Sequence, residues 1–82
     1  KSVRLEVTVT EKTLGNGNRL IDIALPEKTL VVLVKRKSVY FVPSGVTTLM
    51  AGDKLLVITD DYKALAQSCK TKGLSGYKIS TS

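Results

Sequence analysis

The chain begins with a strict alternation of apolar and polar residues over Ser2–Thr10, in which every odd position is Val or Leu. Successive side chains of a strand point to opposite sides, so this period predicts a strand with one buried face. Thr29–Arg36 has a different pattern, because Leu30–Val34 is an unbroken run of aliphatic residues. Such a run predicts a strand covered on both faces, one by the domain's own core and the other by a helix or a second subunit.

A pair of turns leads from Val39–Val42, which forms a predicted hairpin with the strand before it, to a last strand at Lys54–Thr59. Pro43 ends the hairpin without wasting a hydrogen-bond donor, since proline has no N–H. The glycine in each turn tolerates a positive φ angle, which lets the path bend twice. Asp53 follows the second of these glycines, and we interpret it as a turn residue.

Capping signals predict two short helices. Asn18 is placed to cap a helix at Arg19–Ala24, and a proline two residues later ends that helix. Asp60 and Asp61 precede a second helix at Tyr62–Lys70. Either carboxylate can accept hydrogen bonds from the first turn and oppose the helix dipole.

The last segment, 71–82, is rich in Ser, Thr and Gly, and two interpretations stay open for it: an edge strand around Tyr77–Ser80 or a mobile tail. We therefore expect one domain at residues 1–70 and a C-terminal extension at residues 71–82. The order of the elements predicts an α+β fold with a small, largely antiparallel sheet of about four strands. A short helix follows the first strand and a longer helix follows the last.

With 82 residues the chain forms one small domain, whose core is marginal enough that association with a partner would stabilise it. Hydrophobic residues make up 43% of the chain, which argues against disorder. The longest apolar run is far shorter than a membrane helix requires. Lys1–Thr10 lacks the apolar core of a signal peptide, and because the first residue is not Met we expect a piece of a longer chain.

The side chains that most often carry catalysis are missing. The chain has no histidine and one cysteine, Cys69, which excludes an internal disulfide and a multi-thiolate zinc site. We expect no enzyme, no catalytic residue and no metal site. A net charge of +6 favours an anionic partner: a nucleotide, a nucleic acid or a membrane surface. Only four aromatic residues are present, and none interleaves with a basic stripe, which argues against nucleic acid as the partner.

Three segments together resemble a known family. They are Leu25-Pro26, the run Leu30–Arg36 and the stretch Pro43–Val57, which reads P-S-G-x-T-x-L-x-A-G-D-x-L-L-V. The chain is similar in these segments to a TrkA-C (RCK-C) domain, the C-terminal regulatory module of potassium channels and cation transporters. The resemblance covers roughly residues 3–68. The sequence departs from the family at Lys37-Ser38, where Asp-Gly is frequent, and it contains nothing of the Rossmann-like RCK domain that precedes the module in some members.

The resemblance implies a homodimer on the cytoplasmic side of the cell membrane, attached to the membrane-embedded part of a transporter, with a cation/proton antiporter as the best match. It also implies a small regulatory ligand between the subunits, which in several relatives is a nucleotide such as cyclic di-AMP. We expect the ligand site at Val31, Val32, Arg36 and Pro43: apolar walls, an arginine whose planar fork suits phosphate, and a bordering proline.

Three alternatives stay open at this level. The domain senses a ligand and dimerises, it only dimerises, or it is a basic nucleic-acid-binding module. Each site residue also has a plain structural interpretation, with Arg36 as a solvated hairpin residue and Val31 and Val32 as core or dimer contacts.

Overall fold

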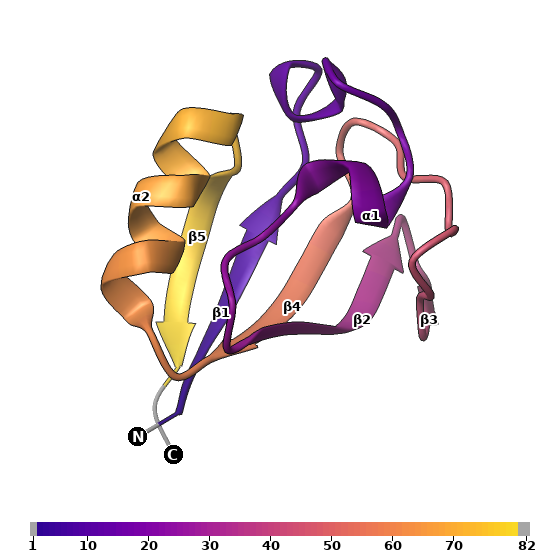
Figure 1. The fold of residues 1–82 in the computed structure, drawn as a ribbon. Coiled ribbons are helices and arrows are strands. Elements are labelled where there is room, and N and C mark those ends of the chain that lie inside the picture. The colour runs from indigo at the N-terminus through magenta and orange to yellow at the C-terminus, as the bar shows by residue number, and fades with distance from the viewer. Residues whose placement is uncertain (1, 81–82) are drawn as a thin grey trace.

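A computed structural model of the chain describes residues 2–80. In that range the chain forms an antiparallel sheet of five strands in the order β3-β2-β4-β1-β5, with helices packed on one face (Figure 1). The elements in chain order are β1 (Val3–Thr8), the 3-10 helix η1 (Lys12–Leu14), α1 (Leu20–Ile23), β2 (Thr29–Arg36), β3 (Val39–Phe41), β4 (Lys54–Thr59), α2 (Tyr62–Lys72) and β5 (Ser75–Ser80).

The predicted α+β class with a small antiparallel sheet is confirmed. The strand beyond the expected four is β5, which pairs with β1 and makes it an interior strand. Of the two interpretations of the C-terminal segment, the described residues therefore match the edge strand, at Ser75–Ser80. Helix α2 runs two residues past the predicted end at Lys70, across the boundary expected there.

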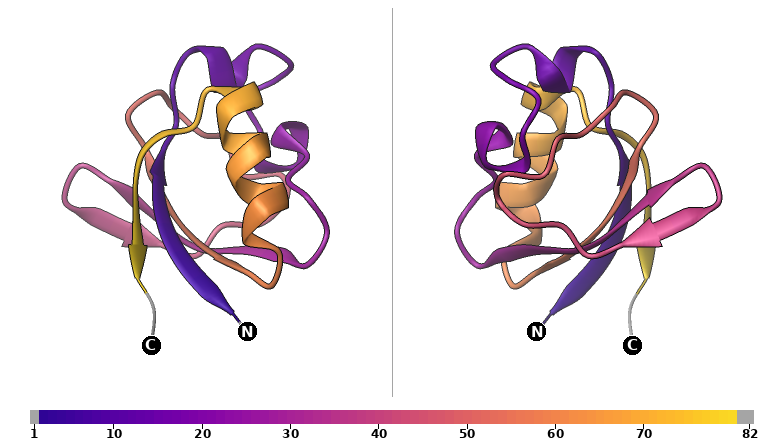
Figure 2. Two further views of the ribbon diagram at one scale, coloured as in Figure 1. Left: turned by 90° about the vertical axis from the view of Figure 1, so that its left-hand side faces the viewer. Right: turned by 90° about the vertical axis from the view of Figure 1, so that its right-hand side faces the viewer.

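The core lies between the sheet and α2. Leu5 and Val7 of β1 lie opposite Val57 and Leu55 of β4, and all four side chains are buried. Figure 2 shows the sheet curving around α2, which contributes Leu65 and the unpaired Cys69 to the same cluster. Burial raises the pKa of the Cys69 thiol, as expected for a small buried hydrophobic residue.

Strand β2 contains a bulge that its sequence does not reveal. Val31 lies opposite Val57, but Leu33 lies opposite Leu56, so Val32 is an extra residue in β2. Within the described chain, the helices cover only the face of β2 that carries the buried Val34. Leu30 on this strand is 63% exposed. The sequence predicted that a helix or a second subunit covers the second face of β2. No helix of the described residues covers this face.

The two turns between β3 and β4, at residues 43–53, form a segment that we call the double turn, and hydrogen bonds hold it to helix α1. The backbone N–H groups of Leu20 and Ile21 donate to the carbonyls of Thr47 and Gly45, both at 2.9 Å. The Leu49 N–H donates in the opposite direction to the Asn18 carbonyl at 2.6 Å. These bonds satisfy the free donors at the start of α1, so the helix and the double turn form one unit.

The predicted capping residue of α1 was wrong. The N-cap is Arg19, not Asn18, and the helix has only four residues. The Asp22 carboxylate accepts from the Arg19 backbone N–H at 3.0 Å and from its guanidinium at 3.2 and 3.3 Å. Gly17 lies beside it with φ 134°, and a Cβ at this position would collide with the Asp22 carboxylate. Glycine is therefore required before this helix.

The predicted cap of α2 is confirmed at Asp61, whose Oδ1 accepts from the Ala64 N–H at 3.1 Å. Gly73 ends the helix with φ 76°, and a Cβ there would lie 2.8 Å from Thr10 Oγ1. At residues 2–80 no helix has both the length and the apolar character needed to span a membrane.

Candidate functional site

Arg36, the predicted anion ligand, forms a two-point ion pair with Asp53. Its Nε donates to Asp53 Oδ1 at 3.0 Å and its Nη2 donates to Oδ2 at 2.8 Å. Nη2 also donates to the Thr48 carbonyl at 3.0 Å, and the Phe41 ring centroid lies 5.2 Å from the guanidinium carbon. The arginine thus joins the end of β2 to the double turn.

Asp53, interpreted from the sequence only as a turn residue, is also the buried partner of Arg36. Its side chain is 2% exposed, and Oδ2 also accepts from the Met50 N–H at 2.9 Å, which closes the second turn. Burial alone would raise the pKa of this carboxyl, but hydrogen bonds from Arg36 and Met50 outweigh burial and hold the pKa below its usual range. Asp53 therefore supports the second turn, as predicted, and also forms an ion pair with Arg36 that was not predicted.

The guanidinium of Arg36 is not fully used by these contacts. The ion pair and the Thr48 contact engage Nε and Nη2, while Nη1 donates no hydrogen bond to any residue of the described chain. The Arg36 side chain is 33% exposed, and the hydrogen bond to Asp53 raises its pKa further. Arg36 therefore keeps a permanent positive charge and a free donor group at the surface.

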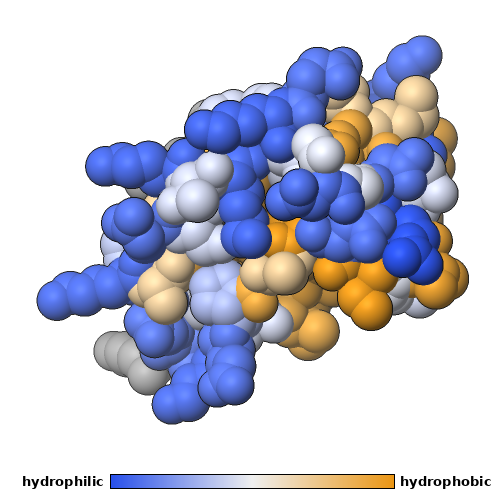
Figure 3. All heavy atoms as spheres, turned by 45° about the horizontal axis from the view of Figure 1, so that its top comes forward, coloured by the Kyte–Doolittle hydropathy of each residue, from blue (hydrophilic) through white to orange (hydrophobic). Residues whose placement is uncertain are grey.

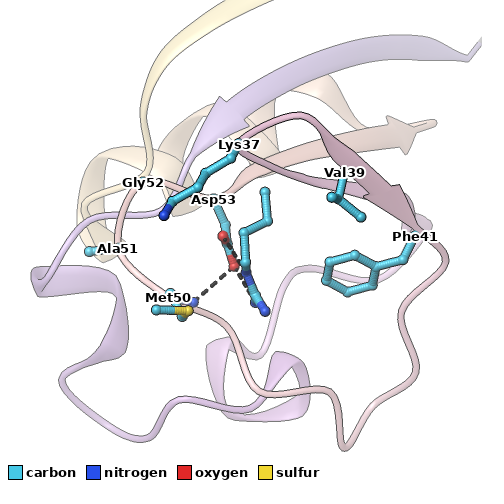
Figure 4. Close-up of a pocket in the computed structure, with 8 residues that line it drawn as sticks. Lys37, Val39, Phe41, Met50, Ala51, Gly52 and Asp53 are labelled. Atoms are coloured by element: carbon cyan, nitrogen blue, oxygen red, sulfur yellow. Dashed lines mark hydrogen bonds and ion pairs between the residues drawn. The ribbon is translucent and has the colours of Figure 1, made fainter.

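A pocket of about 660 Å³ opens beside this arginine, and we call it the Arg36 pocket. In Figure 4 the hairpin residues Val39 and Phe41 lie on one side of it and the turn residues Met50 and Ala51 lie on the other. Most of the wall is apolar and the polar groups are few. The complete lining is Arg36, Lys37, Val39, Phe41, Met50, Ala51, Gly52 and Asp53.

The other predicted site residues lie elsewhere. Val31 and Pro43 line a second pocket of about 380 Å³ between α1, β2 and the first turn, which we call the Pro43 pocket. Val32, the extra residue of the bulge, lines neither pocket. The four predicted residues therefore form no single cavity within one chain.

Both pockets border a group of exposed apolar side chains, which we call the apolar surface. Figure 3 shows apolar side chains gathered on the side of α1 and the β2–β3 hairpin, with hydrophilic side chains beside them and over much of the rest of that view. The most exposed member is Val42 at 78%. The apolar surface consists of Ile21, Leu30, Val39, Val42, Val46 and Met50.

Comparison with protein-family models identifies the family of this chain. The family model of the TrkA-C domain matches residues 4–64, which is most of the chain, and a search of curated proteins finds no match. The matched range contains all of β1 except Val3, the β2–β3 hairpin, the double turn and β4, and it includes every residue of the Arg36 and Pro43 pockets. The chain is therefore a member of the TrkA-C domain family, the regulatory modules of potassium-transport proteins.

Proposed function

We propose that this TrkA-C domain dimerises on the cytoplasmic side of the membrane, senses a small anionic ligand between its two copies, and regulates a potassium or sodium transporter. A cation/proton antiporter is the parent that the sequence favours. The observation that carries the proposal is Arg36, whose free Nη1 lies beside an apolar-walled pocket at the border of the apolar surface.

The apolar surface is our proposed contact with the second copy. Each chain carries a net charge of +6, so two copies repel unless they meet where charges are few. The six side chains of the apolar surface are uncharged, and leaving its 78% exposed Val42 in water is costly. A two-fold contact at this surface would also cover Leu30, the exposed aliphatic side chain of β2.

The ligand we propose is a nucleotide of the cyclic di-AMP type. The Arg36 pocket, at about 660 Å³, falls within the range of known small-molecule sites of roughly 300–1,000 Å³. A phosphate would accept from Nη1 of Arg36, while Val31 and Pro43 in the Pro43 pocket would pack against a base. Because these groups lie in different pockets, the ligand would bridge them at the dimer contact, with Val32 nearby.

The ion pair with Asp53 prepares Arg36 for this role. An arginine side chain loses considerable rotamer freedom when it binds a ligand, and that entropy cost reduces affinity. Asp53 and the Thr48 carbonyl already fix the guanidinium through Nε and Nη2. The ligand phosphate then meets Nη1 of a guanidinium that is already held in place. The phosphate must compete with the Asp53 carboxylate for the positive charge of Arg36.

Regulation follows if one transport state favours the ligand-bound dimer. A ligand shifts a conformational equilibrium only by its difference in affinity for the two states. A nucleotide held between two copies would fix their relative position and favour the transport state compatible with it.

Calorimetric titration of the 82-residue chain with cyclic di-AMP, ATP and ADP tests the proposal. Arg36→Ala removes the phosphate ligand, and Asp53→Asn is the matched control, because both variants break the same ion pair but only the first loses the guanidinium. We expect Arg36→Ala to abolish binding and Asp53→Asn to retain it. Equal binding by wild type and Arg36→Ala would exclude Arg36 as a ligand.

The two alternatives give different results in the same preparation. A chain that forms a dimer but binds none of the nucleotides, by heat or by thermal shift, is a dimerisation module only. A salt-sensitive gel shift with random oligonucleotides, in the absence of nucleotide binding, would favour the nucleic-acid alternative.

A further inference from the structure

Two lysines lie opposite each other where strands β2 and β4 meet. Lys35 and Lys54 are direct partners in the antiparallel register of these strands. Like charges in this position destabilise a sheet. Neither lysine forms an ion pair with any residue at positions 2–80. The sheet therefore carries an electrostatic cost here that no ion pair within the described chain offsets.

A third lysine is added by the turn that follows. Lys37 begins the turn between β2 and β3 with φ 56°, in the left-handed region that favours glycine or asparagine. A lysine at this position strains the backbone and brings one more positive charge to the same end of the sheet. A two-residue hairpin turn requires a positive φ at its first residue, so the tight β2–β3 turn fixes the place of this lysine beside the other two.

The three lysines surround a hollow. Lys35, Lys37 and Lys54, together with Gly52, line a space of about 240 Å³. A Cβ at Gly52 would meet no atom within 4 Å, so the space stays open beside its backbone. One water molecule in the liquid takes about 30 Å³, so the hollow has room for a phosphate group and several water molecules.

The surroundings leave the positive charge in excess. Lys35 Nζ lies 5.5 Å from the centroid of the Tyr40 ring, which holds this ammonium group at the surface. Glu6 lines a smaller neighbouring hollow together with Lys35 and Lys54, but it forms no ion pair with either lysine in the described chain. The charged residues that line these two hollows are therefore three lysines and one glutamate.

The hollow differs from the Arg36 pocket in position. Strand alternation places Lys35 and Lys54 on the sheet face opposite the buried Val34 and Leu55, whereas Arg36 turns toward the buried Asp53. The two spaces share only Lys37 and Gly52 at their border. Lys35 and Lys54, which do not line the Arg36 pocket, therefore distinguish the lysine hollow from it.

We propose that Lys35, Lys37 and Lys54 form a second anion site that binds a phosphate group, either free in solution or carried by an anionic lipid. Three ammonium groups supply point charges and nine N–H donors to phosphate oxygens, and binding removes the repulsion between the paired lysines. A diphosphate, with its higher charge, binds more tightly than a single phosphate.

Binding of two probes to the 82-residue chain tests this site. Inorganic pyrophosphate is titrated by calorimetry, and phosphatidylcholine vesicles with and without phosphatidylglycerol are used in a sedimentation assay. The double variant Lys35→Gln, Lys54→Gln is compared with Lys63→Gln, Lys70→Gln, which removes the same charge from exposed positions of α2. Thermal unfolding checks that both variants are folded.

We expect the β-sheet variant to weaken binding of at least one probe about tenfold or more, and the α2 control to change it less than about twofold. Dependence on the lysines with pyrophosphate indicates a soluble phosphate compound, and dependence only with phosphatidylglycerol vesicles indicates a lipid headgroup. Equal weakening by both variants would mean that net charge alone drives binding and would overturn the site. Failure of the wild type to bind either probe would also overturn it.

Discussion

At the residue scale, the domain depends on one carboxylate with several partners. Asp53 receives two hydrogen bonds from Arg36 and one from the Met50 N–H while almost fully buried. A planar guanidinium can meet both carboxylate oxygens at once, which lysine cannot do. The pair therefore fixes the second turn, the end of β2 and the orientation of the candidate ligand group together.

Asp53→Asn is expected to lower the free energy of unfolding by about 2 kcal/mol, because hydrogen bonds to charged groups contribute roughly 1.5–3 kcal/mol. Urea unfolding followed by circular dichroism measures this loss. Asp22→Asn is the control, since its carboxylate pairs with the 52% exposed Arg19 at the surface, where ion pairs contribute little. A loss at Asp22 as large as that at Asp53 would contradict the assignment.

The lowered pKa of Asp53 also predicts a pH dependence of stability. An unfolded Asp takes up a proton near pH 3.9, while the folded carboxyl does so only at lower pH. The stabilisation is therefore complete above about pH 4 and is lost as the pH falls below it, because the unfolded state binds more protons there. Unfolding curves between about pH 2 and pH 6 should fall less steeply for Asp53→Asn than for wild type. Parallel curves would contradict the lowered pKa.

At the element scale, the bulge at Val32 decides which side chains meet. With the bulge, Lys35 lies opposite Lys54, and Arg36 comes next, toward Asp53. Counting the same strands without an extra residue would put Lys35 opposite Asp53 and turn Arg36 to the other face. One residue therefore creates both the Arg36–Asp53 pair and the lysine pair.

Two single-residue deletions in β2 test this role of the bulge. Deleting Val32 removes the extra residue but keeps the later register, so we expect a folded chain with the Arg36–Asp53 pair intact. Deleting Lys35 moves Arg36 opposite Lys54, and we expect a loss of about 2 kcal/mol or more from the broken pair. Urea unfolding and the NMR signal of the Arg36 Nε–H measure the two effects. The opposite order of stability would contradict the register.

The elements could be predicted where their signals are local. The alternating pattern predicted the first strand, and the capping carboxylates before Tyr62 predicted the start of α2. The proline and glycine residues after Val42 predicted the double turn. The bulge could not be predicted, because five aliphatic residues in a row offer no sign of which one is extra. The Arg36–Asp53 pair depends on that bulge and was missed for the same reason. At α1 the capping prediction failed because Asp22 reaches back to Arg19 and takes the place of an Asn18 cap.

At the scale of the whole molecule, the surface is divided between one apolar region and many positive charges. The apolar surface joins α1, the hairpin and the double turn, which hydrogen bonds unite into one body. A small domain with a marginal core gains stability by covering such a region. We place the second copy there, and not on the lysine-bearing face of the sheet, because like charges would meet in that arrangement.

Val42→Glu is expected to dissociate the proposed dimer, because it puts a charge within the contact, on the side chain that is 78% exposed in the single chain. Sedimentation velocity measures the change, with a dimer for wild type and a monomer for the variant. Thr71→Glu on the exposed side of α2 introduces the same charge away from the apolar surface and should remain a dimer. A wild-type monomer at every concentration, or equal dissociation of both variants, would contradict this contact.

Native mass spectrometry of the chain with cyclic di-AMP, ATP or ADP tests the central claim most directly, because it counts chains and ligands in one particle. The account predicts two chains of 8.9 kDa with one bound nucleotide, and loss of the nucleotide in Arg36→Ala. One nucleotide on each single chain, or dimers that carry none of the three nucleotides, would contradict a ligand site shared between two copies.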